Sequence, residues 1–429
     1  MSGVENRFPA TPARIGATKV PIVSAHRPLV VLLLLPALCL GGSACRQDPV
    51  SADLTEAGAP STVVTTAAAL VFRGVSPGMG FHTCGVTTGD LAYCWGGNGD
   101  YGALGDGTYA TRLRPVAVVG GLKFRQVSAG WGHTCAVTTD NRAYCWGLNT
   151  DGGLGNGTNA SSNRPVAVVG GLRFLVVETG AWHTCGLTTV GRAYCWGNNE
   201  FGHLGDGTKQ RRNVPVAVRG GHTFTQIGAS WEHTCAIDTS GVAWCWGSNK
   251  FGQLGAGDKL TRWTPTKVVG GHLFAQISAG GEQQRGTTCA VTSAHKAYCW
   301  GSVFLGRRGD GDGSITSAVV SPRAVAGSQL FDQIVVGYYH TCAVNTNDRA
   351  WCWGYNFSGE LGDGTTTMRL TPTKVMGTLS FAQLSTGQGW TCGTTTTGVG
   401  YCWGSNSAAT LGDGTQVDRH VPTRIVGPI

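Results

Sequence analysis

A pair of cysteines ten residues apart, repeated seven times, constrains the fold of this 429-residue chain more than any other feature. The tripeptide Cys-Trp-Gly recurs at intervals of 50 to 54 residues, and a second cysteine precedes each copy by ten positions. Self-similarity at a fixed period of this length is typical of repeat arrays such as solenoids and propellers. The pairs are Cys84 and Cys94, Cys135 and Cys145, Cys185 and Cys195, Cys235 and Cys245, Cys289 and Cys299, Cys342 and Cys352, and Cys392 and Cys402.

One unit, residues 124–172, shows what each repeat builds. It holds three short segments with alternating side chains, then a glycine-rich loop, and then Pro-Val-Ala-Val at residues 165–168. Alternation of this kind indicates β-strands, and four strands in about 50 residues are typical of a propeller blade. The sequence therefore predicts an all-β fold, a seven-bladed β-propeller with four-stranded antiparallel blades, over residues 70–429.

The two ends of the repeat region suggest how the ring closes. Residues 421–426 have the character of the Pro-Val strand, whereas no such segment precedes the first unit at Leu70. A lone blade cannot bury both of its faces, so the blades must stack into a closed ring. We therefore expect the C-terminal strand to join the N-terminal unit as a clasp.

The motifs within each unit resemble those of the regulator of chromosome condensation repeat family, whose units are also called alpha-tubulin suppressor-like repeats. They include Gly130 with His133, the segment 146–149 (Trp-Gly-Leu-Asn), and the Gly-x-Leu-Gly segment 152–155. The resemblance covers residues 70–429 and implies a seven-bladed propeller, here as a bacterial exported member. It implies less about activity, because the family includes exchange factors for a small GTPase, a plant light receptor and a secreted bacterial β-lactamase inhibitor.

The first 45 residues have the outline of an export signal. Four basic residues precede the apolar run 29–40, which is too short for a transmembrane helix of about 20 residues. Two kinds of cleavage remain open: ordinary signal peptidase after Ala44, or lipoprotein processing that leaves a lipid on Cys45. Residues 46–69 indicate a flexible tether. We expect an exported protein, either secreted or held in the cell envelope by a lipid anchor at Cys45.

Each cysteine pair is predicted to form a disulfide. Cysteines ten apart around a hairpin turn face each other on adjacent antiparallel strands, with Cα atoms about 4.5–5.5 Å apart. An exported protein allows such bonds, whereas seven reduced thiol pairs would suit the cytosol. A metal site is the other alternative, since His133 lies two residues before Cys135. Oxidised cysteines are not thiolate ligands, and the fifth and seventh units carry Thr287 and Trp390 instead of histidine, so we expect no metal. Each histidine is expected to hydrogen-bond its own loop.

Glycine-rich acidic loops follow the Cys-Trp-Gly strands. The loop around Asp106 could be taken for a calcium or phosphate site, but two units carry Asn156 and Ala256 at this place, so an Asx-type turn is the expected structure. Residues 309–313, Gly-Asp-Gly-Asp-Gly, form the one acidic cluster that suits a calcium titration.

Charge and motifs exclude several function classes. The net charge is +8, and residues 1–45, with four basic residues and one acid, contribute +3 of it. The remaining basic residues form no run that would bind phosphates, so we expect no nucleic-acid partner. The sequence lacks a Gly-x-Ser-x-Gly elbow, a His-Glu-x-x-His helix and a Walker loop. We therefore expect no enzyme, no cofactor and a monomer.

The loop before each Thr-Cys differs most between units, and it is rich in aromatic residues. These are Phe81, Trp131, Trp182, Trp231, Tyr338, Tyr339 and Trp390. Every blade places this loop at the same end, so the aromatics are expected to ring one rim as binding anchors. The fifth unit inserts residues 281–286 there and later carries Arg307-Arg308. We predict a recognition surface of these tryptophans and tyrosines with Glu282 and Arg285. The alternative is that the aromatics only pack between loops.

Three functions are consistent with these features. The leading interpretation is a non-catalytic scaffold that binds an unknown protein or a surface glycan. Guanine-nucleotide exchange on a small GTPase follows from the family resemblance, but export argues against it. A propeller lectin or hydrolase is the third. Cell fractionation with a free-thiol assay separates them, because reduced cysteines in a cytosolic pool would favour the exchange factor.

Overall fold

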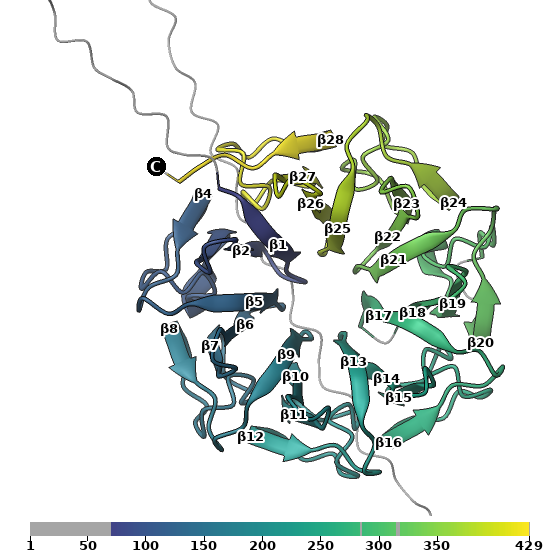
Figure 1. Ribbon diagram of the computed structural model, residues 1–429, viewed down its shortest axis with the longest axis horizontal. Helices are drawn as coiled ribbons and strands as arrows, with labels where there is room; N and C mark the ends of the chain where they lie inside the picture. The colour runs from purple at the N-terminus through teal and green to yellow at the C-terminus, as the bar shows by residue number, and fades with distance from the viewer. Residues whose placement is uncertain (1–69, 284, 315–317, 429) are drawn as a thin grey trace, which may run out of the picture. The chain divides into compact units, whose positions relative to one another are not determined.

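Seven four-stranded antiparallel sheets surround a central axis in the computed structural model (Figure 1). The structure describes residues 70–428 apart from 284 and 315–317. Each sheet takes its four strands in chain order, with the first strand innermost. The predicted seven-bladed propeller is confirmed. The predictions for residues 1–69, including the export signal, the tether and Cys45, lie outside the described residues.

The strand bounds follow the repeat. Blades 1 to 3 are β1 (Phe72–Pro77), β2 (His82–Thr87), β3 (Ala92–Gly96) and β4 (Arg112–Ala117); β5 (Phe124–Ala129), β6 (His133–Thr138), β7 (Ala143–Gly147) and β8 (Ser162–Ala167); and β9 (Phe174–Thr179), β10 (His183–Thr188), β11 (Ala193–Gly197) and β12 (Arg212–Ala217). Blades 4 and 5 are β13 (Phe224–Ala229), β14 (His233–Asp238), β15 (Ala243–Gly247) and β16 (Arg262–Lys267); and β17 (Phe274–Glu282), β18 (Arg285–Thr292), β19 (Ala297–Ser302) and β20 (Ala318–Ala324). Blades 6 and 7 are β21 (Phe331–Val336), β22 (His340–Asn345), β23 (Ala350–Gly354) and β24 (Arg369–Lys374); and β25 (Phe381–Thr386), β26 (Trp390–Thr395), β27 (Gly400–Gly404) and β28 (Arg419–Arg424).

Short 3-10 turns are the only helical elements among the described residues. They are η1 (Gly99–Tyr101) and η2 (Phe304–Gly306). Neither they nor any other part of residues 70–428 that the structure describes forms a helix long and apolar enough to span a membrane.

The ring closes without a clasp strand, so that prediction is wrong. The last strand, β28, pairs with β27 of its own blade, and β4 completes blade 1. The reason is that the Pro-Val strand follows Cys-Trp-Gly within the same unit, so the first unit is already complete. Blade 1 instead meets blade 7 through backbone and side-chain bonds. The Phe72 N–H donates to the Gly398 carbonyl at 2.8 Å, and Trp95 Nε1 donates to the Thr410 carbonyl at 2.9 Å.

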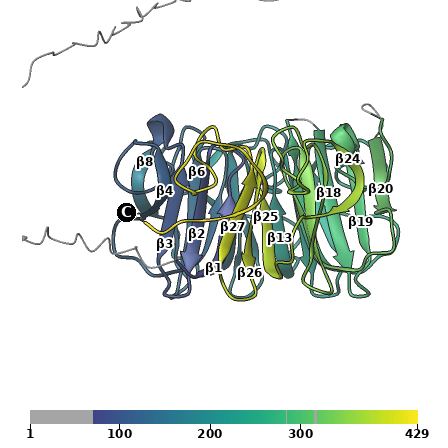
Figure 2. The ribbon, with the colours of Figure 1, turned by 90° about the horizontal axis from the view of Figure 1, so that it is seen from above.

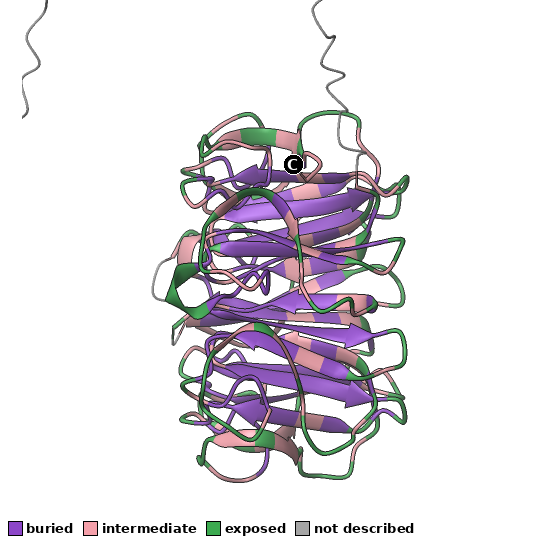
Figure 3. Ribbon diagram, turned by 90° about the vertical axis from the view of Figure 1, so that its left-hand side faces the viewer, coloured by how far each residue is buried: buried purple, intermediate pink, exposed green. Residues whose placement is uncertain are grey.

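The hydrophobic core is divided among the spaces between neighbouring blades. A typical cluster joins Cys84 and Cys94 of blade 1 to Phe124 and Trp146 of blade 2. In Figure 3 the inner strands are mostly buried, whereas the loops at both ends and parts of the outer strands carry the exposed residues. Since each cluster takes side chains from two blades, no single blade can bury its own faces.

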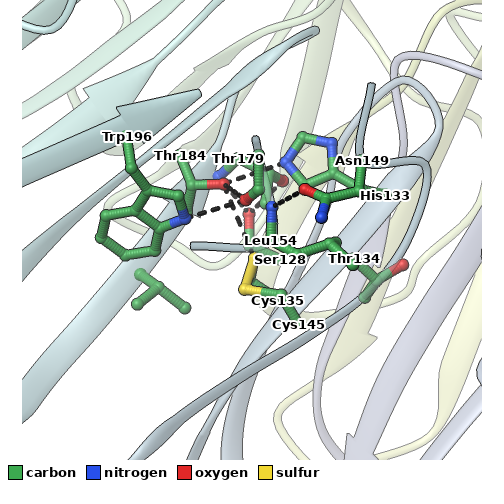
Figure 4. The surroundings of a disulfide bond; sticks show 12 residues. Ser128, His133, Thr134, Cys135, Cys145, Asn149, Leu154, Thr179, Thr184 and Trp196 are labelled. Atoms are coloured by element: carbon green, nitrogen blue, oxygen red, sulfur yellow. Dashed lines mark hydrogen bonds between the residues drawn. A yellow bond between two sulfur atoms is a disulfide. The ribbon is translucent and has the colours of Figure 1, made fainter. Parts of the chain in front are cut away.

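All seven predicted disulfides are present, each within one blade. In blade 2, Cys135 and Cys145 lie directly opposite each other on β6 and β7, with Cα atoms 4.0 Å apart (Figure 4). The other pairs are Cys84–Cys94, Cys185–Cys195, Cys235–Cys245, Cys289–Cys299, Cys342–Cys352 and Cys392–Cys402. Seven such bonds indicate an oxidising environment.

Candidate functional site

Buried histidines join neighbouring blades near one end of the strands. In five blades the histidine that begins the second strand places Nε2 2.7 to 3.0 Å from a threonine Oγ1 of the next blade. The pairs are His82 with Thr134, His133 with Thr184, His183 with Thr234, His233 with Thr288, and His340 with Thr391. We expected bonds within the histidine's own loop, and only His233 has one, to Ser230. The expectation was otherwise wrong because the stacked neighbour, invisible in the local sequence, supplies the nearer oxygen.

The threonine fixes the direction of this bond. Thr184 Oγ1 donates its single proton to the Gly153 carbonyl at 2.9 Å, so it must accept a proton from His133 Nε2 (Figure 4). Trp196 Nε1 donates to the same carbonyl at 2.8 Å. We call the contact at this place between two neighbouring blades a blade junction; here it consists of a ring nitrogen, a threonine and a carbonyl. Its histidine is a structural N–H donor.

Burial keeps these histidines neutral. It lowers the pKa of His82, His233 and His340 to about 3 and that of His133 to about 4. The pKa of His183 is also lowered well below its ordinary value, first by burial and then by the neighbouring His203. A neutral, buried ring that already donates to threonine is not available as a surface acid or base.

Trp390 occupies the histidine position in blade 7. Its side chain is 3% exposed, and Nε1 donates to Thr83 Oγ1 of blade 1 at 2.9 Å. The predicted place of Trp390 on an exposed rim is therefore wrong. Its indole replaces an imidazole as the N–H donor of the last junction, and the sequence could have shown this, because Trp390 aligns with the histidines.

The acidic loops adopt the expected Asx-type turns. Asp106 Oδ1 accepts the Thr108 N–H at 2.9 Å, and Arg112 lies 2.8 Å from the other oxygen. These bonds lower the pKa of Asp106 against the opposing effect of its burial. In the acidic cluster of blade 5, Asp310 and Asp312 both face the buried Arg308, at 2.7 and 3.0 Å. Guanidinium groups therefore neutralise the carboxylates of these loops.

A continuous row of aromatic rings crosses the rim formed by the loops between the first and second strands. We call it the rim track, and its members are Trp131, Trp182, Trp231, Tyr338, Tyr339, Tyr355 and Phe357. Successive ring centroids lie 4.4, 6.3, 5.4, 4.4, 5.3 and 4.6 Å apart. All but Phe357 are half-buried, and Phe357 is 68% exposed. The rings thus pack on one another and still face solvent, which combines both readings of the sequence.

Two members of the track were missed, and two predicted aromatics lie apart from it, the buried Trp390 and Phe81. Tyr355 and Phe357 follow the Cys-Trp-Gly of the sixth unit. The fifth unit also has an aromatic residue, Phe304, at the position of Phe357, but no other unit has one at the position of Tyr355. The aromatic residue at that position was the signal. Phe81 is 56% exposed at the corresponding loop of blade 1.

The fifth blade places the other two predicted binding residues at the tip of a longer hairpin. Glu282 ends β17 and Arg285 begins β18, and both are half-buried. The Arg285 guanidinium lies 3.5 Å from Glu282 and 4.2 Å from the Phe304 ring centroid. This hairpin extends from the same loop position that carries Trp231 in blade 4.

Arg307 holds this hairpin to blade 6. Its side chain is fully buried, and it donates to the Tyr338 carbonyl and, at 2.6 Å, to the Arg285 carbonyl. Burial lowers the Arg307 pKa to about 10, so the guanidinium remains charged at neutral pH. Arg307 therefore positions the tyrosine loop and the hairpin and does not itself reach solvent.

The central channel contains a polar cavity of about 330 Å³, which is lined mainly by the first strands of the blades. Glutamines of these strands bridge to the next blade: Gln276, for example, donates to the Ile334 carbonyl at 2.9 Å and accepts the Ile334 N–H at 3.0 Å. Glu178 lines the channel, where burial raises its pKa to about 7. Backbone bridges of this kind indicate a structural channel.

Seven stacked blades with buried junctions and an aromatic rim define a repeat propeller whose variable residues lie at one end. The repeat model "Regulator of chromosome condensation (RCC1) repeat" matches residues 90–137, 140–187, 190–237, 240–283 and 347–393, more than half of the chain. A second model of the same description also matches residues 331–360. The chain therefore belongs to the regulator of chromosome condensation repeat family.

One relative is similar in a short stretch of sequence, and two solved structures have the same fold at low identity. The Ultraviolet-B receptor UVR8 of Arabidopsis thaliana is 39% identical over 72 residues, which is 16% of this chain and 16% of the receptor. Human WBSCR16 superimposes with a TM-score of 0.70 at 21% identity, over 79% of this chain and 95% of that one. Prp20p of Saccharomyces cerevisiae, described with its binding to Gsp1p and histones, gives a TM-score of 0.70 at 23% identity, over 79% and 87%. These structural likenesses concern the fold alone.

Proposed function

We propose that this protein is an exported, non-catalytic binding scaffold whose rim track recognises a protein partner. The observation that carries the proposal is the unbroken row of half-buried aromatic rings over blades 2, 3, 4 and 6. Aromatic residues that can be fully covered by a partner dominate binding energy at protein interfaces. In repeat proteins, the binding residues also tend to lie in loops that vary between units, while the scaffold stays constant.

The packing of the track favours affinity. Trp131 and Trp182 lie 4.4 Å apart, and Tyr338 and Tyr339 are in contact at the same distance. Rings held by one another lose little conformational freedom when a partner covers them, so less of the binding energy is spent on ordering. The half-buried Glu282 and Arg285 beside the track supply polar contacts at its edge.

The ring geometry favours a protein over a glycan. Glycans stack on flat, open ring faces, whereas Trp182 meets Trp231 at an interplanar angle of 88° and Trp231 meets Tyr338 at 75°. Edge contacts of this kind cover part of each face and leave a corrugated surface. Such a surface suits interdigitating side chains.

Photo-crosslinking in cell-envelope preparations of the source organism tests the proposal. The unaltered chain is expected to capture a discrete partner, and a chain with Trp131→Ala, Trp182→Ala and Trp231→Ala is expected to lose it. Trp263→Ala is the matched control, because Trp263 is 43% exposed but lies on the outer strand β16. Capture by the triple variant at the level of the control would contradict the proposal. A free-thiol assay on the same fraction tests export, since the seven bonded pairs leave at most one free thiol, that of Cys45 when it carries no lipid.

A further inference from the structure

The rim track borders a pocket at blade 7, the blade that lacks a rim aromatic. Blades 2, 3, 4 and 6 carry tryptophan or tyrosine in the loop before the second strand, whereas blade 7 has Gln388-Gly389. The gap is a pocket of about 240 Å³. Its aromatic wall consists of Phe81, Tyr339, Tyr355 and Trp390, so Tyr339 and Tyr355 belong to both the track and the pocket.

Glu360 supplies the only carboxylate among the described residues that line this pocket. The side chain is 1% exposed, and Oε2 accepts the Ser358 N–H at 2.9 Å. The other lining residues are aromatic, small or neutral, and none of those described is basic. A buried carboxylate that meets no cation carries a desolvation cost, which an incoming positive charge would relieve.

The electrostatics around Glu360 are uniformly negative or neutral. Burial, more than any other cause, raises the Glu360 pKa to about 7, and the nearby Asp418 contributes to this rise. The Tyr355 hydroxyl is held neutral, because burial and then Glu360 raise its pKa. A cation in the pocket would therefore find a carboxylate, a second acid close by, and the electron-rich faces of aromatic rings.

We propose that this pocket binds the ammonium or guanidinium group of a lysine or arginine side chain of the protein partner. Aromatic rings attract organic cations through their quadrupoles, and a desolvated carboxylate forms a charge-assisted hydrogen bond with them. The volume lies below the roughly 300–1,000 Å³ of pockets for drug-sized ligands, which fits one side chain. The inference rests on the proposed function, because a partner that covers Tyr339 and Tyr355 would bring its side chain to this pocket.

Titration of the full chain with small cations tests the pocket without the partner. The probes are the N-acetyl, N-methylamide derivatives of lysine and arginine, with the norleucine derivative as the neutral match to lysine and choline as a free quaternary ammonium. We expect calorimetric binding of the lysine and arginine derivatives and at least tenfold weaker binding of norleucine. Choline that binds while both amino-acid derivatives do not would contradict a side-chain ligand.

Three variants locate the binding. Glu360→Gln keeps the shape of the side chain and should weaken cation binding at least tenfold, without lowering the thermal midpoint. Glu200→Gln is the matched control, because Glu200 is an exposed acid in the corresponding loop of blade 3, and it should bind like the unaltered chain. Gly389→Leu should also abolish binding by filling the gap. A Cβ at Gly389 would meet Ser405 Cβ at 3.5 Å and Glu360 Oε1 at 3.7 Å, which are ordinary contacts.

The outcomes separate this inference from the proposed function. Absence of binding by all cations, or unchanged binding in Glu360→Gln, overturns the pocket while leaving the crosslinking test of the tryptophans intact. Cation binding that depends on Glu360, together with partner capture that survives the triple tryptophan variant, overturns the proposed rim function and leaves the pocket as a cation site.

Discussion

Six of the seven described blade junctions use a ring N–H, and the junction between blades 5 and 6 does not. In five, histidine donates to the threonine of the next blade, and in the sixth Trp390 does so. In blade 5 the corresponding Thr287 is too short, and its hydroxyl donates to the Ser302 carbonyl of its own blade at 2.9 Å. Arg307 instead links the two blades, through the carbonyls of Tyr338 and Arg285.

Each junction therefore has a buried N–H donor, but the residue that supplies it differs. Imidazole, indole and guanidinium all supply N–H groups from a buried position. They differ in proton affinity: the histidines take up a proton in mild acid once unfolding exposes them, whereas Trp390 and the charged Arg307 have no such equilibrium there. The fifth junction therefore combines a longer hairpin with a donor that is independent of pH.

Mild acid should produce the largest effect, because it acts on all histidine junctions at once. The folded-state pKa values of His82, His133, His233 and His340, about 3 to 4, lie below the unfolded value of 6.5. The unfolded state then binds more protons, so this contribution to stability is complete above pH 6.5 and is lost progressively as the pH falls from there to about 3. At pH 5 each histidine lowers the free energy of unfolding by about 2 kcal/mol relative to neutral pH, and four together lower it by up to about 8 kcal/mol.

Two glutamates have the opposite effect on the pH dependence of stability, and replacing them provides a control for the histidines. The folded-state pKa values of Glu178 and Glu360 are raised to about 7 from 4.5, so their protonation adds stability as the pH falls through that window. Glu178→Gln with Glu360→Gln should therefore make the acid loss steeper. Denaturant unfolding at pH 7.5, 6 and 5, with disulfides intact, measures both slopes. Equal stability at pH 7.5 and 5 in the double variant would show that the histidines are not buried as described.

Replacing Arg307 should give the second largest effect, confined to the fifth junction. Arg307→Ala removes two charge-assisted bonds to buried carbonyls and leaves a cavity, at a cost of about 3–5 kcal/mol. The loss should be nearly the same at pH 7.5 and 6, unlike that of a histidine junction. Arg323→Ala is the control, because that side chain is 57% exposed and should change stability by less than about 1 kcal/mol. A pH-dependent loss in Arg307→Ala would break the distinction between the junctions.

The sequence alone predicted what repeats and missed what depends on a neighbouring blade. The propeller, its strands and the disulfide pairs follow from periodicity, because both partners of each pair lie in one unit, ten residues apart. The histidine partners did not follow, since His133 bonds to Thr184 about fifty residues later. The clasp was wrong for a related reason: a Pro-Val strand was expected before the first unit, although in every unit this strand follows Cys-Trp-Gly, so β4 already completes blade 1.

The candidate site was likewise predicted only in part from the sequence. The rim track was visible in part, because Trp131, Trp182 and Trp231 interrupt an otherwise constant pattern. Its end was not visible: Glu360 and Gln388 come from different blades, and only stacking brings them to one pocket. Trp390 was assigned to the surface from its residue type, although its alignment with the histidines marked it as buried. Position within the repeat was the better guide than side-chain character.

The smallest expected effect tests the difference between the histidine junctions and the fifth junction most directly, because it isolates one hydrogen bond. Thr184→Val and Thr341→Val remove equivalent hydroxyls, which donate to the carbonyls of Gly153 and Arg307 at 2.9 and 2.8 Å. Both carbonyls keep a second donor, Trp196 Nε1 or Trp353 Nε1. Only the first substitution also removes an acceptor, that of the His133 N–H.

A buried N–H without an acceptor costs about 1–3 kcal/mol, so Thr184→Val should be about 1 kcal/mol or more less stable than Thr341→Val. Because valine matches threonine in shape, packing contributes equally to both. Denaturant unfolding at pH 7.5 measures the difference, with Thr391→Val, which faces His340, as a second histidine junction that should follow Thr184→Val. If Thr341→Val proved as costly as the other two, the hydroxyl-to-carbonyl bond would be the essential part of every junction, and the ring donor would only fill space.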